Sequence, residues 1–433
     1  MRVNLQALGC RLNEAELETW ARQFQQLGHE LSQDEAGADL VVVNTCAVTQ
    51  EAVRKSRKLL RRAQRVNPQA KLVVSGCFAT LDRQVLVQEG GIDLLIPNQD
   101  KDRLVALATA ELDLPAMPLT AMAAGANPLF ARGRQRAFIK VQDGCRYRCT
   151  FCIVTLARGE ERSRPIQEVV DEINLAAAEG VKEVVLTGVH LGGWGSDVGL
   201  SLSDLIGAIL SGTGIPRLRL GSLEPWELSE GFWDLFRDPR LMPHLHLPLQ
   251  SGADSVLRRM ARRCATAEYA RLAAQARARV PDINLSTDII VGFPGETVTE
   301  WHQTLDFVER IGFGQVHIFV YSPRPGTKAA SLPQQVAAAI KRERSQTMHQ
   351  LARRMKAATL AKHIGLRTAI LVEGRHGATG GGDWFGYTPH YLPVRLPPLS
   401  AEDLTNRMVQ VELVASDEEA SSLMAKLLAS DGK

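Results

Sequence analysis

The chain begins with short apolar runs that alternate with stretches of helical periodicity. The apolar runs cover residues 3–8, Asp39–Asn44 and Lys71–Ser75, and the helical stretches cover Glu14–Leu27, Glu51–Val66 and a segment from about Asp82. Strands that are buried on both faces are continuously apolar, and strands that alternate with helices run parallel. The sequence therefore predicts an α/β fold that begins with a doubly wound parallel sheet.

The alternation stops at residues 113–133 and then resumes. This stretch is poor in charge and rich in proline, alanine and glycine, which is typical of a linker. Six β-rich runs separated by helical stretches follow it: Phe138–Gln142, Glu183–Thr187, Arg217–Leu223, His244–Gln250, Asn284–Val291 and Gln315–Tyr321. This pattern predicts a partial or complete (β/α) barrel.

A third pattern occupies the end of the chain, after a long helical run from about Leu332 to His363. Short β-rich segments at Thr368–Glu373, Tyr391–Arg395 and Met408–Ala415, with a glycine-rich turn at Gly380–Gly382, predict a small β-barrel or OB-like module. A length of 433 residues fits about three domains. We expect them at residues 1–125, 126–362 and 363–433.

Composition excludes several classes of protein. With 45% hydrophobic and 23% charged residues the chain is not disordered, and a mean hydropathy of −0.10 without a long apolar stretch predicts no membrane partner. The first residues enter a strand-like pattern without an apolar signal core, so we expect a cytoplasmic protein. The net charge of +3 does not by itself indicate a nucleic-acid partner. Seven cysteines in a reducing compartment favour metal or redox chemistry over disulfides.

Three cysteines occupy equivalent places in the predicted sheet. Cys10, Cys46 and Cys77 each follow one of the first three strands. Because the carboxyl ends of parallel strands share one edge, where such folds bind ligands, we expect the three thiols to converge. The alternative is three buried cysteines that pack as small hydrophobic side chains.

Three more cysteines, Cys145, Cys149 and Cys152, lie within eight residues directly after a strand. A loop can turn all three thiolates toward one metal centre. Their spacing differs from that of zinc ribbons, whereas thiolates are the usual ligands of iron–sulfur clusters. Three ligands on a four-iron cluster leave one iron open for a reaction, while a structural zinc is the alternative.

The Cys145–Cys152 triad, with an aromatic residue before its last cysteine, resembles the signature of the radical S-adenosylmethionine enzymes. Together with Cys10, Cys46 and Cys77, it resembles the methylthiotransferases within that superfamily, which carry a second cluster in an N-terminal domain. The resemblance extends over most of the chain, through Leu8–Glu14, Asn44–Thr49, Gln142–Cys145, Ala157–Gly159, Arg162–Arg164, Thr287–Glu296 and Tyr321–Thr327. Gly386–Thr388 with Tyr391 resembles the family's C-terminal TRAM domain, a small RNA-binding barrel.

The residues after Cys10 discriminate between branches of the family. Arg11-Leu12-Asn13 resembles the branch that modifies N6-threonylcarbamoyladenosine at tRNA position 37. The isopentenyladenosine branch tends to carry Gln-Met-Asn here, and the branch that modifies a ribosomal-protein aspartate tends to carry Pro-Lys-Asn. The resemblance therefore implies a tRNA methylthiotransferase that acts on the anticodon stem-loop, with the other two substrates as alternatives.

The resemblance also implies the cofactors. These are two 4Fe–4S clusters, on Cys10/Cys46/Cys77 and on Cys145/Cys149/Cys152, and S-adenosylmethionine on the open iron of the second. Reductive cleavage would give a 5′-deoxyadenosyl radical, which takes hydrogen from C2 of the adenine, and the first cluster would hold the sulfur that is transferred. The electron would come from a donor such as a flavodoxin or a ferredoxin, and no catalytic side chain is expected beyond the cluster ligands.

Weaker expectations concern the S-adenosylmethionine contacts. They are Phe151, Thr187, Gly188, Glu224, Gln250 and Ile290. Phe151 lies within the triad, next to Cys152, and the others lie at the ends of predicted barrel strands, each with packing as its alternative.

The odd cysteine and the basic residues complete the expectations. We interpret Cys264 as structural. Basic residues of the second helix form either a solvated face or a phosphate track: Arg54, Lys55, Arg57, Lys58, Arg61, Arg62 and Arg65. Candidate RNA contacts are Arg132, Arg134, Arg136, Arg367, Arg375 and Arg395, with Trp384, Tyr387 and Tyr391 as stacking or core residues. A non-catalytic RNA-binding protein with structural zinc is the alternative from another class.

Overall fold

The structure is a computed structural model that describes residues 1–115, 129, 133–375, 382–398, 402–417, 419 and 421–428. It divides into two compact units. The first unit comprises Met1–Arg164, Thr187–His190 and Ser322–Ala330, and the second comprises Pro165–Leu186, Leu191–Tyr321 and Ser331–Lys433. Most of the predicted linker and of the glycine-rich turn lies outside the described residues.

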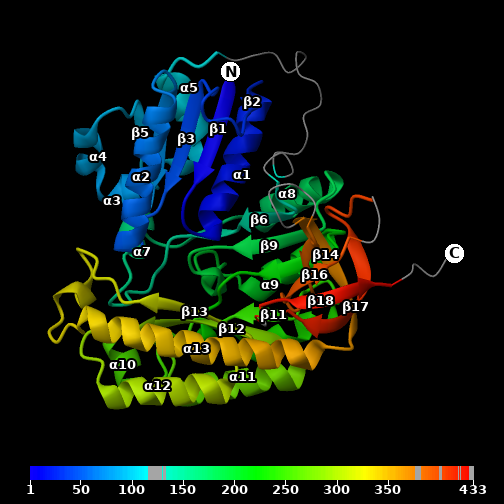
Figure 1. Ribbon diagram of the computed structural model, residues 1–433. Helices are drawn as coiled ribbons and strands as arrows, with labels where there is room; N and C mark the ends of the chain where they lie inside the picture. The colour runs from blue at the N-terminus through cyan, green and yellow to red at the C-terminus, as the bar shows by residue number, and fades with distance from the viewer. Residues whose placement is uncertain are drawn as a thin grey trace. The chain divides into compact units, whose positions relative to one another are not determined.

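A five-stranded parallel sheet forms the centre of the first unit (Figure 1). Its strands are β1 (Arg2–Ala7), β2 (Glu30–Leu31), β3 (Leu40–Thr45), β4 (Lys71–Gly76) and β5 (Leu94–Ile96), in the order β2-β1-β3-β4-β5. All pairings are parallel, with Val3 opposite Leu40 and Leu40 opposite Lys71. The predicted doubly wound sheet is confirmed.

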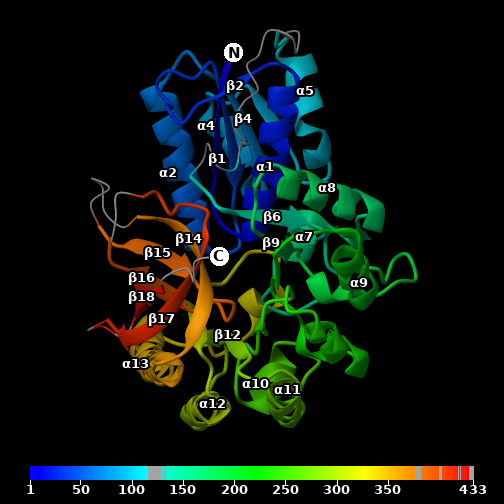
Figure 2. The same ribbon diagram turned by 90° about the vertical axis from the view of Figure 1, so that its right-hand side faces the viewer.

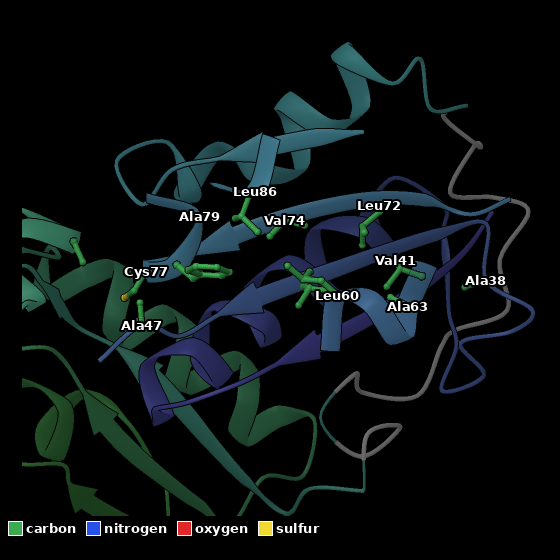
Figure 3. Close-up of a cluster of buried hydrophobic side chains, with 13 residues drawn as sticks. Ala38, Val41, Ala47, Leu60, Ala63, Leu72, Val74, Cys77, Ala79 and Leu86 are labelled. Atoms are coloured by element: carbon green, nitrogen blue, oxygen red, sulfur yellow. The ribbon is translucent and has the colours of Figure 1, made fainter. Parts of the chain in front are cut away.

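Alternate residues of the strands supply two separate cores, one on each face of the sheet. Val42 and Val73 pack with Trp20 and Phe24 of α1 (Arg11–Gln26) and with α5 (Leu104–Glu111). On the other face, Val41, Val43, Leu72 and Val74 pack against α2 (Gln50–Val66), α3 (Cys77–Leu81) and α4 (Arg83–Glu89), as Figure 3 shows. The period of two in each strand explains both layers.

The remainder of the first unit consists of short elements around the second cysteine set. They are the 3-10 turn η1 (Lys101–Arg103), β6 (Arg136–Lys140), β7 (Gln142–Asp143), α7 (Val154–Arg158) and β8 (Arg162–Ser163), and β7 pairs antiparallel with β8. The amide of Val141 donates to the carbonyl of Thr187 at 2.9 Å, which places residues 187–190 beside this segment.

Parallel strands and helices alternate through most of the second unit. Its strands are β9 (Glu183–Thr187, whose last residue belongs to the first unit), β10 (Arg217–Leu220), β11 (His244–His246), β12 (Asn284–Val291) and β13 (Gln315–Val320). Its helices are α8 (Ile166–Ala178), α9 (Leu202–Gly212), α10 (Asp254–Arg259), α11 (Thr266–Arg279), α12 (Val298–Ile311) and α13 (Ala338–His363), with the 3-10 turns η3 (Leu191–Gly193), η4 (Pro225–Glu227) and η5 (Glu230–Arg237). The 3-10 turn η6 (Lys328–Ser331) belongs to the first unit except for its last residue. β9 pairs with β10, and β11, β12 and β13 form a second parallel set. Together with β6 of the first unit, these strands account for all six predicted runs, as a partial (β/α) barrel requires.

The end of the chain closes into a five-stranded barrel in the order β14-β15-β16-β18-β17 (Figure 2). The strands are β14 (Arg367–Arg375), β15 (Trp384–Tyr387), β16 (Pro393–Leu396), β17 (Met408–Ser416) and β18 (Leu423–Leu427). Ile370, Trp384, Val394 and Val411 lie in its core together with Leu360 of α13. The predicted small β-barrel is confirmed, and we refer to it as the C-terminal barrel.

The C-terminal barrel is fastened within the second unit by the turn Thr388–Tyr391. Buried Arg219 donates to the carbonyls of Thr388 and Pro389 while its guanidinium lies 4.7 Å from the Tyr391 ring centroid. Glu183 accepts from Arg219 at 2.8 Å, so the buried charge is paired. β10 therefore binds this turn through the side chain of Arg219. Within the part of the chain that the structure describes, no helix has both the length and the apolar character of a membrane span.

Candidate functional site

Cys10, Cys46 and Cys77 follow β1, β3 and β4 directly, at the carboxyl edge of the sheet. In this strand order the connections run in opposite directions from β1 and from β3, which makes the gap between them the switch point where doubly wound folds bind ligands. The backbone of Gly9 lies so close to Cys46 that a Cβ on Gly9 would meet the Cys46 Sγ at 2.8 Å. A φ of +114° suits glycine at this point of close approach.

Polar side chains hold the backbone around these cysteines. Asn13 donates to the carbonyls of Leu8 and Thr45 at 2.7 and 3.2 Å and accepts from the Cys10 thiol. Ser56 donates to the carbonyl of Cys46 and accepts from its amide. Asn98 lies 3.7 Å from the Cys77 Sγ. The turns that carry the thiols are therefore fixed by hydrogen bonds.

The three thiols influence one another electrostatically. Burial, with smaller contributions from Cys77 and Cys10, raises the pKa of Cys46 to about 11, although a backbone hydrogen bond from Val48 and the charge of Arg158 lower it. A thiol with this pKa is protonated at neutral pH. Because metals bind thiolates, occupation of the site by a metal would release protons.

The second set lies on the loop between β7 and α7. Gly144, with φ of +74°, begins this loop, and the amide of Cys145 donates to the carbonyl of Gly159 at 3.1 Å. The amides of Tyr147 and Val154 donate to the sulfurs of Cys145 and Cys152 at 3.4 and 3.5 Å. Amide hydrogen bonds to sulfur stabilise the thiolate form, which iron–sulfur clusters require. The donor set of the loop therefore fits a cluster.

Gln142 binds this loop to residues 187–190. Its side-chain Nε2 donates to the backbone carbonyls of Asp143 and Gly144. Its side-chain Oε1 accepts from the backbone amide of His190 at 2.8 Å. A Cβ on Gly188 would lie 2.9 Å from the Gln142 Oε1, so the backbone at Gly188 approaches this side chain closely. Thr187 is buried and Phe151 is half-buried. The structure therefore brings Phe151, Thr187 and Gly188 into the unit that carries the cysteines.

A His–Glu pair that the sequence analysis did not single out lies beside Cys145. The Nδ1 of His190 bonds to Glu161, and ligand atoms of Cys145, Glu161 and His190 lie within 4.8 Å of one another. Arg146 also pairs with Glu161, at 3.2 Å. The sequence signal that could have identified His190 is its position three residues after the end of β9, where barrels carry functional residues.

Five ionisable groups form a buried charge network in the first unit: Glu16, Lys101, Lys140, Asp143 and Arg158. Burial alone would raise the pKa of Glu16, but Arg158, Lys101 and Lys140 hold it well below its ordinary value. Burial would likewise lower the pKa of Arg158, but Glu16 and Asp143 raise it. Burial and Arg158 lower the pKa of Lys101, whereas Glu16 raises it. None of the five was a candidate site residue in the sequence, although Asp143 and Arg158 lie in the segments Gln142–Cys145 and Ala157–Gly159 that resemble the family.

The remaining predicted contacts lie in the second unit. Glu224 accepts two hydrogen bonds from Arg262, at 3.1 and 2.6 Å. Gln250 has a φ of +78°, which is costly outside glycine, and the carbonyl of Gln250 accepts from the amide of Ile290 at 2.9 Å. Such strain is characteristic of functional positions. His246 and Asp288, 3.2 Å apart, form a further polar pair on β11 and β12.

The structure also places the odd cysteine and the basic and aromatic residues. Cys264 donates to the carbonyl of Ala265, and burial raises its pKa to about 11, as a structural role predicts. Trp384 is 3% exposed and belongs to a core, which supports the core alternative for this residue, whereas Tyr387 stacks on Tyr391. Arg134 pairs with Glu14, and Arg132 lies outside the described residues.

Two family models match the chain. One, described as "Uncharacterized protein family UPF0004", matches residues 2–97, and the other, described as "Radical SAM superfamily", matches residues 139–308. Their boundaries enclose the first and the second cysteine set, respectively. Radical SAM enzymes use S-adenosylmethionine and a 4Fe–4S cluster.

Relatives that match along most of the chain are tRNA-modifying enzymes. The threonylcarbamoyladenosine tRNA methylthiotransferase MtaB of Thermotoga maritima is 35% identical over 86% of this chain and 86% of that protein. MtaB of Bacillus subtilis is 31% identical over 95% of this chain and 93% of that protein. The tRNA-2-methylthio-N(6)-dimethylallyladenosine synthase of Chloroflexus aurantiacus is 33% identical over 94% and 88%, respectively.

Solved structures agree with this assignment at the level of the fold. The radical S-adenosylmethionine methyltransferase TsrM of Kitasatospora setae, bound to tryptophan and a SAM analogue, matches with a TM-score of 0.58 at 18% identity, over 76% of this chain and 75% of that one. Together with the relatives that match along most of their length, these findings identify the chain as a radical SAM methylthiotransferase, an enzyme that transfers a sulfur group.

Proposed function

We propose that this enzyme adds a methylthio group to C2 of N6-threonylcarbamoyladenosine at position 37 of tRNA. The observation that carries the substrate is the segment Cys10–Asn13, in which the Arg-Leu-Asn form of the threonylcarbamoyladenosine branch follows the cysteine. Several relatives named MtaB, which match at 31–35% identity, support the same substrate. Asn13 also has a structural role, because it binds the turns that carry Cys10 and Cys46.

In this proposal the two cysteine sets hold two 4Fe–4S clusters. Cys145, Cys149 and Cys152 hold the cluster that binds S-adenosylmethionine, and Cys10, Cys46 and Cys77 hold the one that carries the sulfur. The clusters supply radical generation and sulfur transfer, which acid–base chemistry cannot provide at a carbon without an acidic proton. Three protein ligands in each set leave one coordination position for reaction.

The protein's own residues orient the cofactor in this proposal. Gly188 and Thr187 present backbone beside the triad, and Gln142 fixes that backbone through His190. Phe151 packs on the adenine of S-adenosylmethionine, while Glu224, Gln250 and Ile290 contact its ribose and adenine. Strain at Gln250 supports a role in binding, because a nonglycine residue retains a positive φ only where its surroundings enforce it.

The proposal includes the partners and the division of the chain. The substrate is the anticodon stem-loop of tRNA, and the electron donor is a flavodoxin or a ferredoxin in the cytoplasm. Residues 1–125 form the domain with the sulfur-carrying cluster, residues 126–362 the radical SAM barrel, and residues 363–433 a TRAM domain. The closed C-terminal barrel supports the last assignment.

Mass spectrometry of tRNA nucleosides tests the substrate. A strain that lacks the gene should lose the 2-methylthio-N6-threonylcarbamoyladenosine signal, and the wild-type gene should restore it. An unchanged signal in the deletion strain would overturn the proposal. Loss of 2-methylthio-N6-isopentenyladenosine instead would select the activity named for the Chloroflexus relative.

A cysteine variant tests the division of labour between the two sites. Replacing Cys10, Cys46 and Cys77 together with alanine should abolish methylthiolation but leave reductive cleavage of S-adenosylmethionine, because the second set is intact. Iron content should fall from about eight to about four atoms per chain. Cys264→Ser is the matched control and should retain both activities. Loss of cleavage in the triple variant, with about four irons still bound, would contradict the assignment.

A further inference from the structure

The short helix α7 (Val154–Arg158) lies between the two cysteine sets and contacts both. At its start, the amide of Val154 donates to the Cys152 Sγ at 3.5 Å. At its end, the carbonyl of Gly159 accepts from the amide of Cys145 at 3.1 Å. The loop of the second set therefore begins and ends on hydrogen bonds to this helix and the residue after it.

Two side-chain links join the same helix to the first set. The Nη2 of Arg158 donates to the Oδ1 of Asn13 at 2.8 Å, and Asn13 accepts from the Cys10 thiol at 3.7 Å. The Nδ2 of Asn98 donates to the carbonyl of Ala157 at 2.8 Å and lies 3.7 Å from the Cys77 Sγ. Each link spans from a thiol of the sulfur-carrying site to α7 through one asparagine.

Arg158 occupies the centre of the buried charge network. Its side chain is 2% exposed, and its Nη1 lies 2.9 Å from Glu16 and 3.1 Å from Asp143. Asp143 precedes Cys145 by two residues, and Glu16 follows Cys10 by six residues on α1. One guanidinium thus pairs with a carboxylate beside each cysteine set. The fork of an arginine can hold several acceptors in one plane, which a lysine cannot do.

The charge of Arg158 also acts on the thiols. The Nη2 of Arg158 and the thiol of Cys10 both donate to the Oδ1 of Asn13, at 2.8 and 3.7 Å, so the cation lies near the first set, and Cys77 and Cys10 accordingly raise the pKa of Arg158. Reduction adds negative charge to a thiolate-ligated cluster, and a buried cation nearby favours the reduced form. Removing this cation would therefore make the neighbouring cluster harder to reduce.

We propose that Arg158 is a positioning residue that holds the two cluster sites in register and stabilises the reduced form of the cluster on Cys10, Cys46 and Cys77. It acts through Asn13, Glu16 and Asp143 and does not itself touch a reacting atom. This role rests on the proposed two-cluster function. It goes beyond that function by assigning the coupling of the two sites to a single buried cation.

Two substitutions separate the two parts of this role. Arg158→Gln removes the charge and replaces the guanidinium with a shorter, neutral planar amide. In the parent, Lys101 lies 2.6 Å from Glu16 and Lys140 lies 3.6 Å from Asp143, so each carboxylate retains a second cationic partner when Arg158 is replaced. Arg158→Lys keeps the charge but loses the fork. Lys71→Gln is the matched control, since it removes an exposed cation, paired with Asp93, from the start of β4.

The first measurement is the reduction potential of the sulfur-carrying cluster. It is followed by electron paramagnetic resonance in full-length protein whose Cys145, Cys149 and Cys152 are replaced with alanine, so that only the other set binds iron. Arg158→Gln should shift the potential to more negative values, whereas Arg158→Lys and Lys71→Gln should leave it near the parent value. Equal potentials in all four proteins would overturn the electrostatic part.

The second measurement, on chains with all six cysteines, is the ratio of 5′-deoxyadenosine to methylthiolated nucleoside. Arg158→Lys should raise this ratio several-fold at unchanged iron content, because cleavage continues while the sulfur site is out of register. An unchanged ratio would overturn the positioning part, even if Arg158→Gln did not fold. Iron content separates failure of the role of Arg158 from failure of the two-cluster function. About four rather than about eight irons in the parent would refute the two-cluster function itself.

Discussion

Gly144 shows how a single residue determines whether the second cysteine set can form. Its φ of +74° is unfavourable for other residues, and a Cβ at this position would lie 1.8 Å from the carbonyl oxygen of Glu160. The obstacle is backbone rather than a flexible side chain. The loop that begins at Cys145 can therefore close only if residue 144 has no side chain.

We expect Gly144→Ala to reduce iron content to about four atoms per chain and to abolish cleavage of S-adenosylmethionine. The destabilisation should be on the order of 2–4 kcal/mol, because strain and a backbone clash add. Iron analysis and thermal unfolding of the reconstituted protein measure both effects.

Gly199→Ala is the control for backbone strain alone. Gly199 has nearly the same φ, +73°, but nothing lies within 4 Å of its ideal Cβ. This variant should cost about 1 kcal/mol and bind iron normally. If the two alanine variants behaved alike, the clash with Glu160 would not control the loop.

Functional residues could be predicted from the sequence where their spacing follows a local pattern, and could not where they depend on contacts between distant parts of the chain. The six cysteines were recognisable because three are spaced on one loop and three follow successive strands. Arg158 lies in the family-like segment Ala157–Gly159, but its role was not recognisable, because its partners Glu16 and Asn13 lie 142 and 145 residues away and buried ion pairs leave no periodic pattern. Only the packing of α1 and α7 within the first unit reveals the network.

The turn Thr388–Tyr391 gives the second unit a pH-sensitive element. Burial, with the nearby charges of His363, Arg219 and Arg217, lowers the pKa of His390 to about 4 from an ordinary value of 6.5. Between these two values the unfolded chain binds a proton that the folded chain does not. The free energy of unfolding should therefore fall as the pH decreases from 6.5 to 4.

We expect this contribution to be roughly 2 kcal/mol, less than the full shift of the pKa would give, because His390 is partly exposed. His390→Gln should reduce the loss of stability between pH 6.5 and pH 4, whereas His302→Gln, at an exposed position of α12, should not. Chemical denaturation followed by tryptophan fluorescence measures the difference. Parallel pH profiles for His390→Gln and the parent would contradict this origin.

At the level of elements, the long apolar strands were predictable and the short ones were not. β9 and β12 match their predicted bounds, since each is a β-rich run with clear ends. β2 and β5 have two and three residues and leave no periodic signal. The strand expected from Tyr391 begins at Pro393 instead, because Tyr391 has a φ of +63° and belongs to the docking turn.

The helix expected from about Asp82 is also different in the structure. It forms two helices, with α3 beginning at Cys77 and α4 at Arg83. Asp82, with φ of −120°, separates them. Cys77 is thus the first residue of a helix rather than part of a loop, which places its thiol at the sheet edge beside those of Cys10 and Cys46.

For the whole molecule, a net charge of +3 leaves the recognition of tRNA to local groups, and the basic helix α2 is the most conspicuous candidate. The structure pairs five of its seven cations with neighbouring carboxylates. Arg54 lies 2.5 Å from Glu51, and Arg61 lies 3.5 Å from Glu89. Lys55, Arg57 and Arg62 also have acidic partners. These pairs favour a solvated face over a phosphate track.

The salt dependence of tRNA binding distinguishes these two roles. Each cation that neutralises a phosphate contributes about one to the slope of log Kd against log salt concentration. The double variant Arg54→Gln/Arg61→Gln should therefore keep the parent slope, because both side chains pair with glutamates and release no counterions from RNA. Fluorescence anisotropy with a labelled anticodon stem-loop, titrated at several salt concentrations, gives the slope. A decrease of about two would show that α2 contacts the phosphate backbone directly and that its ion pairs open on binding.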